Sequence, residues 1–275
     1  MNFDDANFLL AAFVSSLLVV MISIEAGYRL GRRAHRRSAD EKESPISAIE
    51  GSVLALLAFF LAFTFQIASN RFDARKELVR QEANTIRTAW HRSDFLPEAD
   101  RGEAKRLLRE YVAARVSAFQ SAEAERVKQI LDDAEKIQNS LWDMAVTNAR
   151  RDMNSDVAAL YIQSLNELSA VHASRVAVAL QMRIPPGIWV TLAVLTSLGM
   201  IMVGYQTAVA ESKRTLAMPI LAVAFALVVT LIGSLDHPLA GFTLTAVSQQ
   251  PLIDLLADIE EQRLATPLNR PGARH

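Results

Sequence analysis

Apolar residues along this chain are gathered into four uninterrupted blocks, and most of the charges lie between the blocks. The blocks cover residues 8–28, 51–69, 188–205 and 216–235. Each holds about 18–21 residues, and a helix needs about 20 residues to cross a hydrocarbon core of ~30 Å. Glu25, near the end of the first block, is the one ionisable residue inside them. The pattern predicts four transmembrane helices, and the alternative is four buried helices of a large soluble protein.

The first block is predicted to remain in the protein as an anchor. A secretory leader carries its positive charges before the apolar run. Here Asp4 and Asp5 precede the block and the arginines follow it. We therefore expect residues 8–28 to stay in the membrane and not to be cleaved.

The long segment between the second and third blocks is predicted to be helical. It has few glycines, prolines and β-branched residues, a composition that favours helices over strands. The second span is expected to continue into it without a break, because apolar side chains recur every seven residues at Phe65, Phe72, Val79 and Ile86. Pro97 is expected to end this helix, since proline lacks the N–H that the helix needs.

Three more helices are predicted in this segment, over about 97–122, 123–150 and 156–184. The pair Asn154-Ser155 is the expected N-cap of the last helix, whose apolar face begins at Leu160. After the fourth span, a short amphipathic helix is predicted to lie either on the membrane surface or on the helical segment. Its apolar positions are Leu252, Leu255, Leu256 and Ile259.

The expected fold class is all-α, with four transmembrane helices and a long helical insertion between the second and third. We divide the chain into four parts. They are the first two spans with a basic loop (1–69), a helical extramembrane domain (70–185), the last two spans (186–236), and a C-terminal loop with a short helix (237–275).

Composition and motifs argue against several classes of function. The formal net charge is −1, and no basic stripe with interleaved aromatic residues appears, so we expect no nucleic-acid partner. The chain has no cysteine, which excludes disulfides, cysteine-ligated metals and thiol nucleophiles. Zinc-protease, P-loop and dinucleotide-binding motifs are absent, and the histidines lack the spacing of a metal site. We expect neither an enzyme nor a bound metal or cofactor.

Lysine and arginine in the short loops predict the orientation in the inner membrane. Six of them follow the first span and two lie between the last two spans, whereas none precedes the first span. The flanks of the long helical segment are also basic, but a segment of that length carries less weight. We therefore expect the short loops in the cytoplasm and the helical domain on the non-cytoplasmic side.

Polar residues in and near the spans are the candidate functional residues. Glu25 lies four residues before Arg29, a spacing that allows an ion pair on one helix face, although Glu25 alone could also reach the headgroups. On the second span a shared face carries Phe59, Phe63, Gln66 and Asn70. In a ring of such helices this face would form an aromatic constriction and an amide-lined mouth. The alternative is that the phenylalanines face lipid or neighbouring helices.

Three stretches together resemble one known family. They are "SIEAGYRLGRRAHRR", "LAFTFQIASNRFDARKELVRQEANTI", and "SLDHPLAGF" with "VSQQPL". The chain resembles the bacterial bestrophin-like domain family over residues 15–255. That family is distantly similar in layout to bestrophins, which are pentameric anion channels whose second span lines the pore with a hydrophobic neck. The resemblance implies the same layout here and a channel role for Phe59 and Phe63. This chain differs from bestrophins in two respects. Bestrophins keep the helical insertion in the cytoplasm, whereas the loop charges here predict it on the other side of the membrane. No acidic calcium clasp is recognisable in this sequence.

Two hypotheses follow. In the first, the chain forms a homo-oligomer in the lipid bilayer and conducts small anions, which Arg71, Arg75 and Lys76 would attract to the mouth. In the second, the chain is a non-conducting membrane scaffold or envelope sensor whose helical domain binds a partner. A closed ring of subunits favours the first, and a monomer favours the second.

Overall fold

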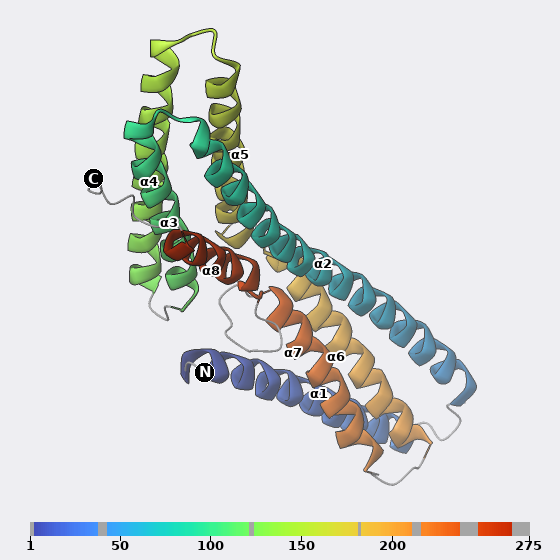
Figure 1. Cartoon of the computed structure of the whole chain (residues 1–275). Helices are drawn as coiled ribbons and strands as arrows, with labels where there is room; N and C mark the ends of the chain where they lie inside the picture. The colour runs from blue at the N-terminus through green and yellow to red at the C-terminus, as the bar shows by residue number, and fades with distance from the viewer. Residues whose placement is uncertain are drawn as a thin grey trace, which may run out of the picture. The chain divides into compact units, whose positions relative to one another are not determined.

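The computed structural model describes residues 3–37, 43–120, 124–180, 183–210, 216–236 and 247–265. In these ranges the chain is all-α, with eight α-helices, one short 3₁₀ helix and no strand (Figure 1). The helices are α1 (Phe3–Arg37), α2 (Glu43–Arg92), η1 (Ser93–Phe95), α3 (Glu98–Gln120), α4 (Ala124–Arg151), α5 (Asp156–Leu180), α6 (Pro186–Val209), α7 (Ala217–Asp236) and α8 (Gln250–Ala265).

Four of the described helices are long and apolar enough to cross a membrane. These candidate spans are Leu9–Arg36, Ile46–Phe95, Pro186–Val209 and Ala217–Asp236. They agree with the four predicted blocks, and α3, α4 and α5 form the helical insertion between the second and third. The second span does continue into the polar segment, because α2 is one helix of 50 residues.

The chain forms two compact units, and the boundary between them falls inside α2. The first contains residues Met1–Asp73 and Met182–Ala246. The second contains Ala74–Gln181 and Val247–His275. Each unit has its own hydrophobic core.

In the first unit α1 packs against α6 and α7. The contact with α6 depends on glycines, because a Cβ added at Gly27 would overlap the backbone of Ile201, and one at Gly204 would overlap that of Ile24. Gly31 continues the same approach one turn later: a Cβ there would lie 2.6 Å from the carbonyl oxygen of Tyr205. Small residues four apart let membrane helices approach at backbone distance.

The second unit packs α3, α4, α5 and α8 around the polar half of α2. Val79 and Ile86 from the seven-residue repeat lie in its core. Leu252, Leu255 and Ile259 of α8 are buried in the same core, so the C-terminal helix lies on the helical domain and not on the membrane surface. Of the pair Asn154-Ser155 predicted to cap α5, Ser155 is the cap: its side-chain hydroxyl accepts a hydrogen bond from the N–H of Ala158 at 3.2 Å.

Three expectations were wrong in detail. α2 ends at Arg92 and passes into η1, so the helix stops before Pro97. Phe65, predicted on the buried seam, is 39% exposed. Leu160, predicted on the buried face of α5, is 41% exposed, and that face begins at Tyr161 instead. A repeat of seven residues drifts slowly around a straight helix, which explains why Phe65 and Val79 do not share one buried face.

Candidate functional site

The predicted phenylalanine and amide residues lie together on one exposed face of α2. The rings of Phe59 and Phe63 are stacked, with centroids 6.5 Å apart and planes 12° from parallel. They are 67% and 54% exposed, respectively. One turn further, the Gln66 side-chain amide donates a hydrogen bond to Asn70 Oδ1 at 2.7 Å. The face therefore changes from aromatic to amide along the helix axis and is not covered by other described parts of the chain.

Arg71 forms an ion pair and is therefore not an isolated exposed charge. Its Nη1 lies 3.3 Å from Asp236 Oδ1, at the end of α7. Asp236 also accepts a hydrogen bond from the backbone N–H of Ile184 at 2.9 Å. The pair thus ties the second and fourth spans and the start of the third together, and it joins two stretches, "RFDARK" and "SLDHPL", on which the resemblance depends. Arg75 and Lys76, on the next turn of α2, are half-buried.

Glu25 and Arg29 are in contact on α1. Arg29 Nε donates a hydrogen bond to Glu25 Oε1 at 2.7 Å. The Arg29 side chain is 72% exposed and that of Glu25 35% exposed, so the pair lies at the surface of the helix. An exposed pair of this kind contributes little to stability.

The second unit contains a buried ionic cluster that the sequence analysis did not identify. At its centre is Glu82 of α2, which is completely buried. Arg175 of α5 donates a hydrogen bond to Glu82 Oε2, and Arg115 Nε of α3 lies 2.9 Å from Oε1 without hydrogen-bond geometry. Tyr111 donates its hydroxyl hydrogen to Glu82 Oε1 at 2.9 Å. One carboxylate therefore faces two guanidinium groups.

Hydrogen bonds around Tyr111 determine the tautomer of His172. The Tyr111 hydroxyl has one hydrogen, which goes to Glu82, because a carboxylate can only accept. Gln138 Nε2 donates to the same oxygen at 3.1 Å. His172 Nδ1 lies 3.2 Å from it, so this nitrogen carries the hydrogen and donates.

Burial changes the proton affinities in this cluster. Burial and, to a smaller extent, the charge of Arg115 lower the pKa of His172 to about 4, so the imidazole is neutral near pH 7. Burial also raises the pKa of Tyr111 to about 12 and lowers that of Arg175 to about 10. At neutral pH the tyrosine is therefore protonated, and the net charge of Glu82, Arg115 and Arg175 is positive.

One sequence signal could have indicated this cluster. Glu82 lies between Val79, Ala83 and Ile86 on the apolar seam of α2, and a carboxylate at a buried position requires a cationic partner. Arg115 likewise interrupts the apolar face of α3. Nothing in the spacing, however, shows that the two residues meet.

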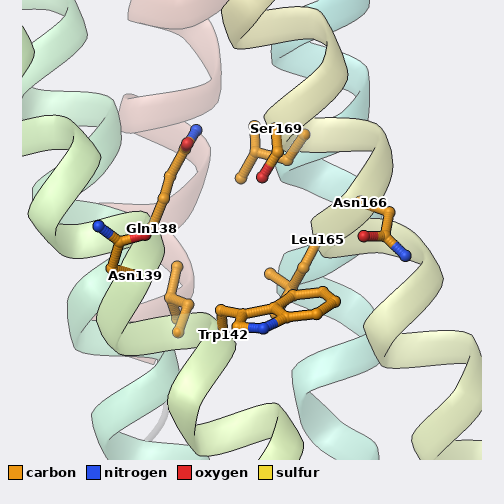
Figure 2. A pocket seen from close by; sticks show the side chains of 8 residues that line it. Gln138, Asn139, Trp142, Leu165, Asn166 and Ser169 are labelled. Carbon is orange, nitrogen blue, oxygen red and sulfur yellow. The ribbon is translucent and has the colours of Figure 1, made fainter.

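A pocket of about 300 Å³ lies between α4 and α5 in the second unit. Figure 2 shows Gln138, Asn139 and Trp142 on one side and Leu165, Asn166 and Ser169 on the other. Its walls carry amide, hydroxyl and indole groups but no charge, and Gln138 connects it through Tyr111 to Glu82. Among the described residues, no three His, Asp or Glu side chains gather into a metal site.

Comparisons with known proteins identify the fold. Residues 9–252 match the model of the bestrophin-like domain. The structure is similar to two mutants of a bacterial bestrophin homologue from Klebsiella pneumoniae. One is 17% identical with a TM-score of 0.62, the other 16% identical with 0.64, and each match covers 94% of this chain and 98% of that one. A mutant membrane protein, 16% identical, matches with a TM-score of 0.62 over 94% of this chain and 97% of its own. No curated protein matches.

Proposed function

This chain belongs to the bestrophin-like domain family, and from that premise we propose that several copies form a channel for small anions in the inner membrane. In this proposal α2 lines the pathway, Phe59 and Phe63 form a hydrophobic neck, and Gln66 and Asn70 line its mouth. The proposal assigns the chain no catalytic reaction and no cofactor.

The exposed face of α2 is the observation that supports this proposal best. Exposed phenylalanines alone are equally suited to lipid. The two amide side chains on the same face are not, because a polar group facing hydrocarbon loses its hydrogen bonds to water. The hydrogen bond between Gln66 and Asn70 uses one N–H of Gln66 and one lone pair of Asn70 Oδ1. The remaining N–H groups and lone pairs of the two amides can still bind water. A face that changes from stacked rings to open amides fits a water-filled path with a dry constriction, which can gate by dewetting.

Basic residues that follow this face on α2 would attract anions. Asp236 compensates the charge of Arg71, so we assign Arg71 mainly to holding the spans together. Arg75 and Lys76, on the next turn of the helix, contribute positive potential near this face in this proposal.

Ion flux through purified protein in liposomes tests the neck. Phe59→Ala combined with Phe63→Ala should raise anion conductance and change rectification, because it widens and wets the constriction. Phe65→Ala is the matched control, since it makes the same chemical change on another face of α2. If the wild-type protein conducts nothing, or if the double variant conducts and rectifies as the wild type does, the neck is not where we place it.

We also propose that the second unit faces the non-cytoplasmic side, because the short loops carry eight basic residues and would stay in the cytoplasm. The absence of cysteine makes labelling straightforward. Met153→Cys, at a position 88% exposed between α4 and α5, should react in intact cells with a maleimide that cannot cross the membrane. Ala39→Cys, in the basic segment after the first span, should react only after lysis. The reverse pattern would overturn this orientation.

A second candidate function is a non-conducting scaffold or sensor, and the pocket between α4 and α5 favours it. Asn139, Asn166 and Ser169 make no side-chain hydrogen bond within the described part of the chain, so they are available to a partner. A monomeric particle without anion flux, together with loss of a partner in Asn139→Ala plus Asn166→Ala, would support this function over the channel.

A further inference from the structure

The outward face of α1 carries a groove of about 560 Å³ that has both an apolar and a charged part. Met21, Ile22 and Leu30 line the apolar part, and the last two are 65% and 50% exposed, respectively. The opposite face of α1 is occupied, because Gly27 and Gly31 pack against α6. The groove is therefore a surface of a membrane-spanning helix that the described parts of the chain do not cover.

The charged part of the groove has an excess of positive charge. It contains Glu25, Arg29 and Arg33, which together carry a formal charge of +1. Arg29 uses its Nε–H for Glu25, and its two terminal nitrogens carry four further N–H groups that can donate to a ligand. Arg33 is exposed one turn further, and residues four apart on a helix have Cβ atoms about 5–6 Å from each other. Two guanidinium groups thus lie within reach of one small anionic group.

We propose that this groove binds one anionic phospholipid. Its acyl chain lies along Met21, Ile22 and Leu30, and its phosphate lies between Arg29 and Arg33. Glu25 orients Arg29 by holding its Nε. The apolar part belongs to the first span, and the two arginines follow the end of the predicted span, at the depth where lipid phosphates occur. Guanidinium groups bind phosphate oxygens through paired, charge-assisted hydrogen bonds.

Charge favours a lipid over a second copy of the chain. A symmetric contact between two α1 grooves would bring Arg29 and Arg33 of each copy toward like charges. An anionic headgroup instead compensates the excess charge. The inference needs α1 in a bilayer, as the family and the apolar spans indicate, but it needs neither conduction nor a ring of subunits, so the two proposals can fail separately.

Native mass spectrometry of the detergent-purified, delipidated protein tests this site. We expect the wild type to retain phosphatidylglycerol at least ~10-fold better than phosphatidylcholine. Arg29→Gln with Arg33→Gln should remove that preference. Arg126→Gln with Lys128→Gln, which removes two exposed positive charges from α4 in the other unit, should keep it. Unchanged helicity and elution volume would show that each variant is folded.

Three outcomes would overturn the proposal. The first is equal preference for phosphatidylglycerol in the wild type and in a folded Arg29→Gln, Arg33→Gln variant. The second is full displacement of the lipid by millimolar inorganic phosphate, which would show a site for free anions without acyl recognition. The third is efficient disulfide cross-linking between copies carrying Ile22→Cys, which would show that a second chain occupies the groove.

Discussion

Glu82 shows how much one buried carboxylate can affect a domain. It is completely buried, and its partners Arg115 and Arg175 are 6% and 17% exposed in their side chains. Removing one member of a buried ionic group costs more than the group contributes, because the remaining charges have lost water without gaining a counter-charge. Tyr111 would also lose its acceptor.

The first prediction concerns this carboxylate. Glu82→Gln should lower the free energy of unfolding by about 3–5 kcal/mol, since it leaves two buried guanidinium groups uncompensated. Chemical denaturation in detergent, followed by helicity, measures the change. Glu77→Gln, on the same helix with a side chain 55% exposed and 3.8 Å from Arg80, should change it by less than about 0.5 kcal/mol. Equal effects of the two substitutions would show that the cluster is not stabilising.

The second prediction concerns pH. His172 has a pKa of about 4 in the folded protein and about 6.5 in an unfolded chain. Between these values the unfolded state binds a proton that the folded state does not. Stability is therefore fully present above about pH 6.5 and falls as the pH drops toward 4. His172→Gln should flatten the pH dependence of the unfolding midpoint between pH 7.5 and 5. His91→Gln, at an exposed position, controls for the loss of a histidine.

The sequence allowed only the local part of this chemistry to be predicted. Glu25 and Arg29 are four apart on one helix, so their contact follows from helical geometry alone. Glu82, by contrast, meets residues from α3 and α5, and their approach depends on how three helices pack. Arg71 shows the same limit: the sequence alone predicts a charge that attracts anions, whereas the structure pairs it with Asp236, a residue far along the chain at the end of α7.

At the scale of elements, the lengths of the apolar segments predicted where the helices lie, but not which helices pack against one another. The four spans could be located because a bilayer requires a fixed length of apolar helix. The spacing of Leu252, Leu255 and Ile259 predicted an amphipathic α8, but a membrane and a protein core require the same apolar face. Only the packed structure decides between them. Gly27 and Gly204 were overlooked for a similar reason, since a close approach requires a specific partner helix.

The third prediction concerns this glycine contact. Gly27→Ala should destabilise the first unit by about 1–3 kcal/mol, because the new Cβ overlaps the backbone of Ile201 and pushes α1 away from α6. Thermal unfolding in detergent measures the loss. Gly51→Ala adds the same methyl group to α2, where no atom lies within 4 Å, and should leave stability unchanged or slightly higher. A Gly27→Ala protein as stable as wild type would mean that α1 and α6 tolerate a wider separation.

At the scale of the whole molecule, the described spans of one chain pack against one another without an open pathway between them. The first unit fills its interior with side chains: Leu57, Leu192, Met200 and Ala222 are buried in one apolar core. Ala68, Ile184 and Ile232 are buried in a second. Interiors of this kind are packed as densely as organic crystals. If the protein conducts, the path must therefore lie between copies, where the exposed face of α2 is available.

The fourth prediction follows from this packing. In lipid nanodiscs the protein should appear as a closed ring of several identical subunits with α2 nearest the axis, because an exposed face with both rings and amides is best accommodated around a shared water-filled path. Particle mass and class-average symmetry measure the copy number, and Phe59→Cys on the cysteine-free background should cross-link neighbouring copies. Leu227→Cys is the control, because Leu227 is 56% exposed but lies on α7, and this variant should not cross-link neighbouring copies. A conducting monomer would contradict both the ring and the packed interior from which it is inferred.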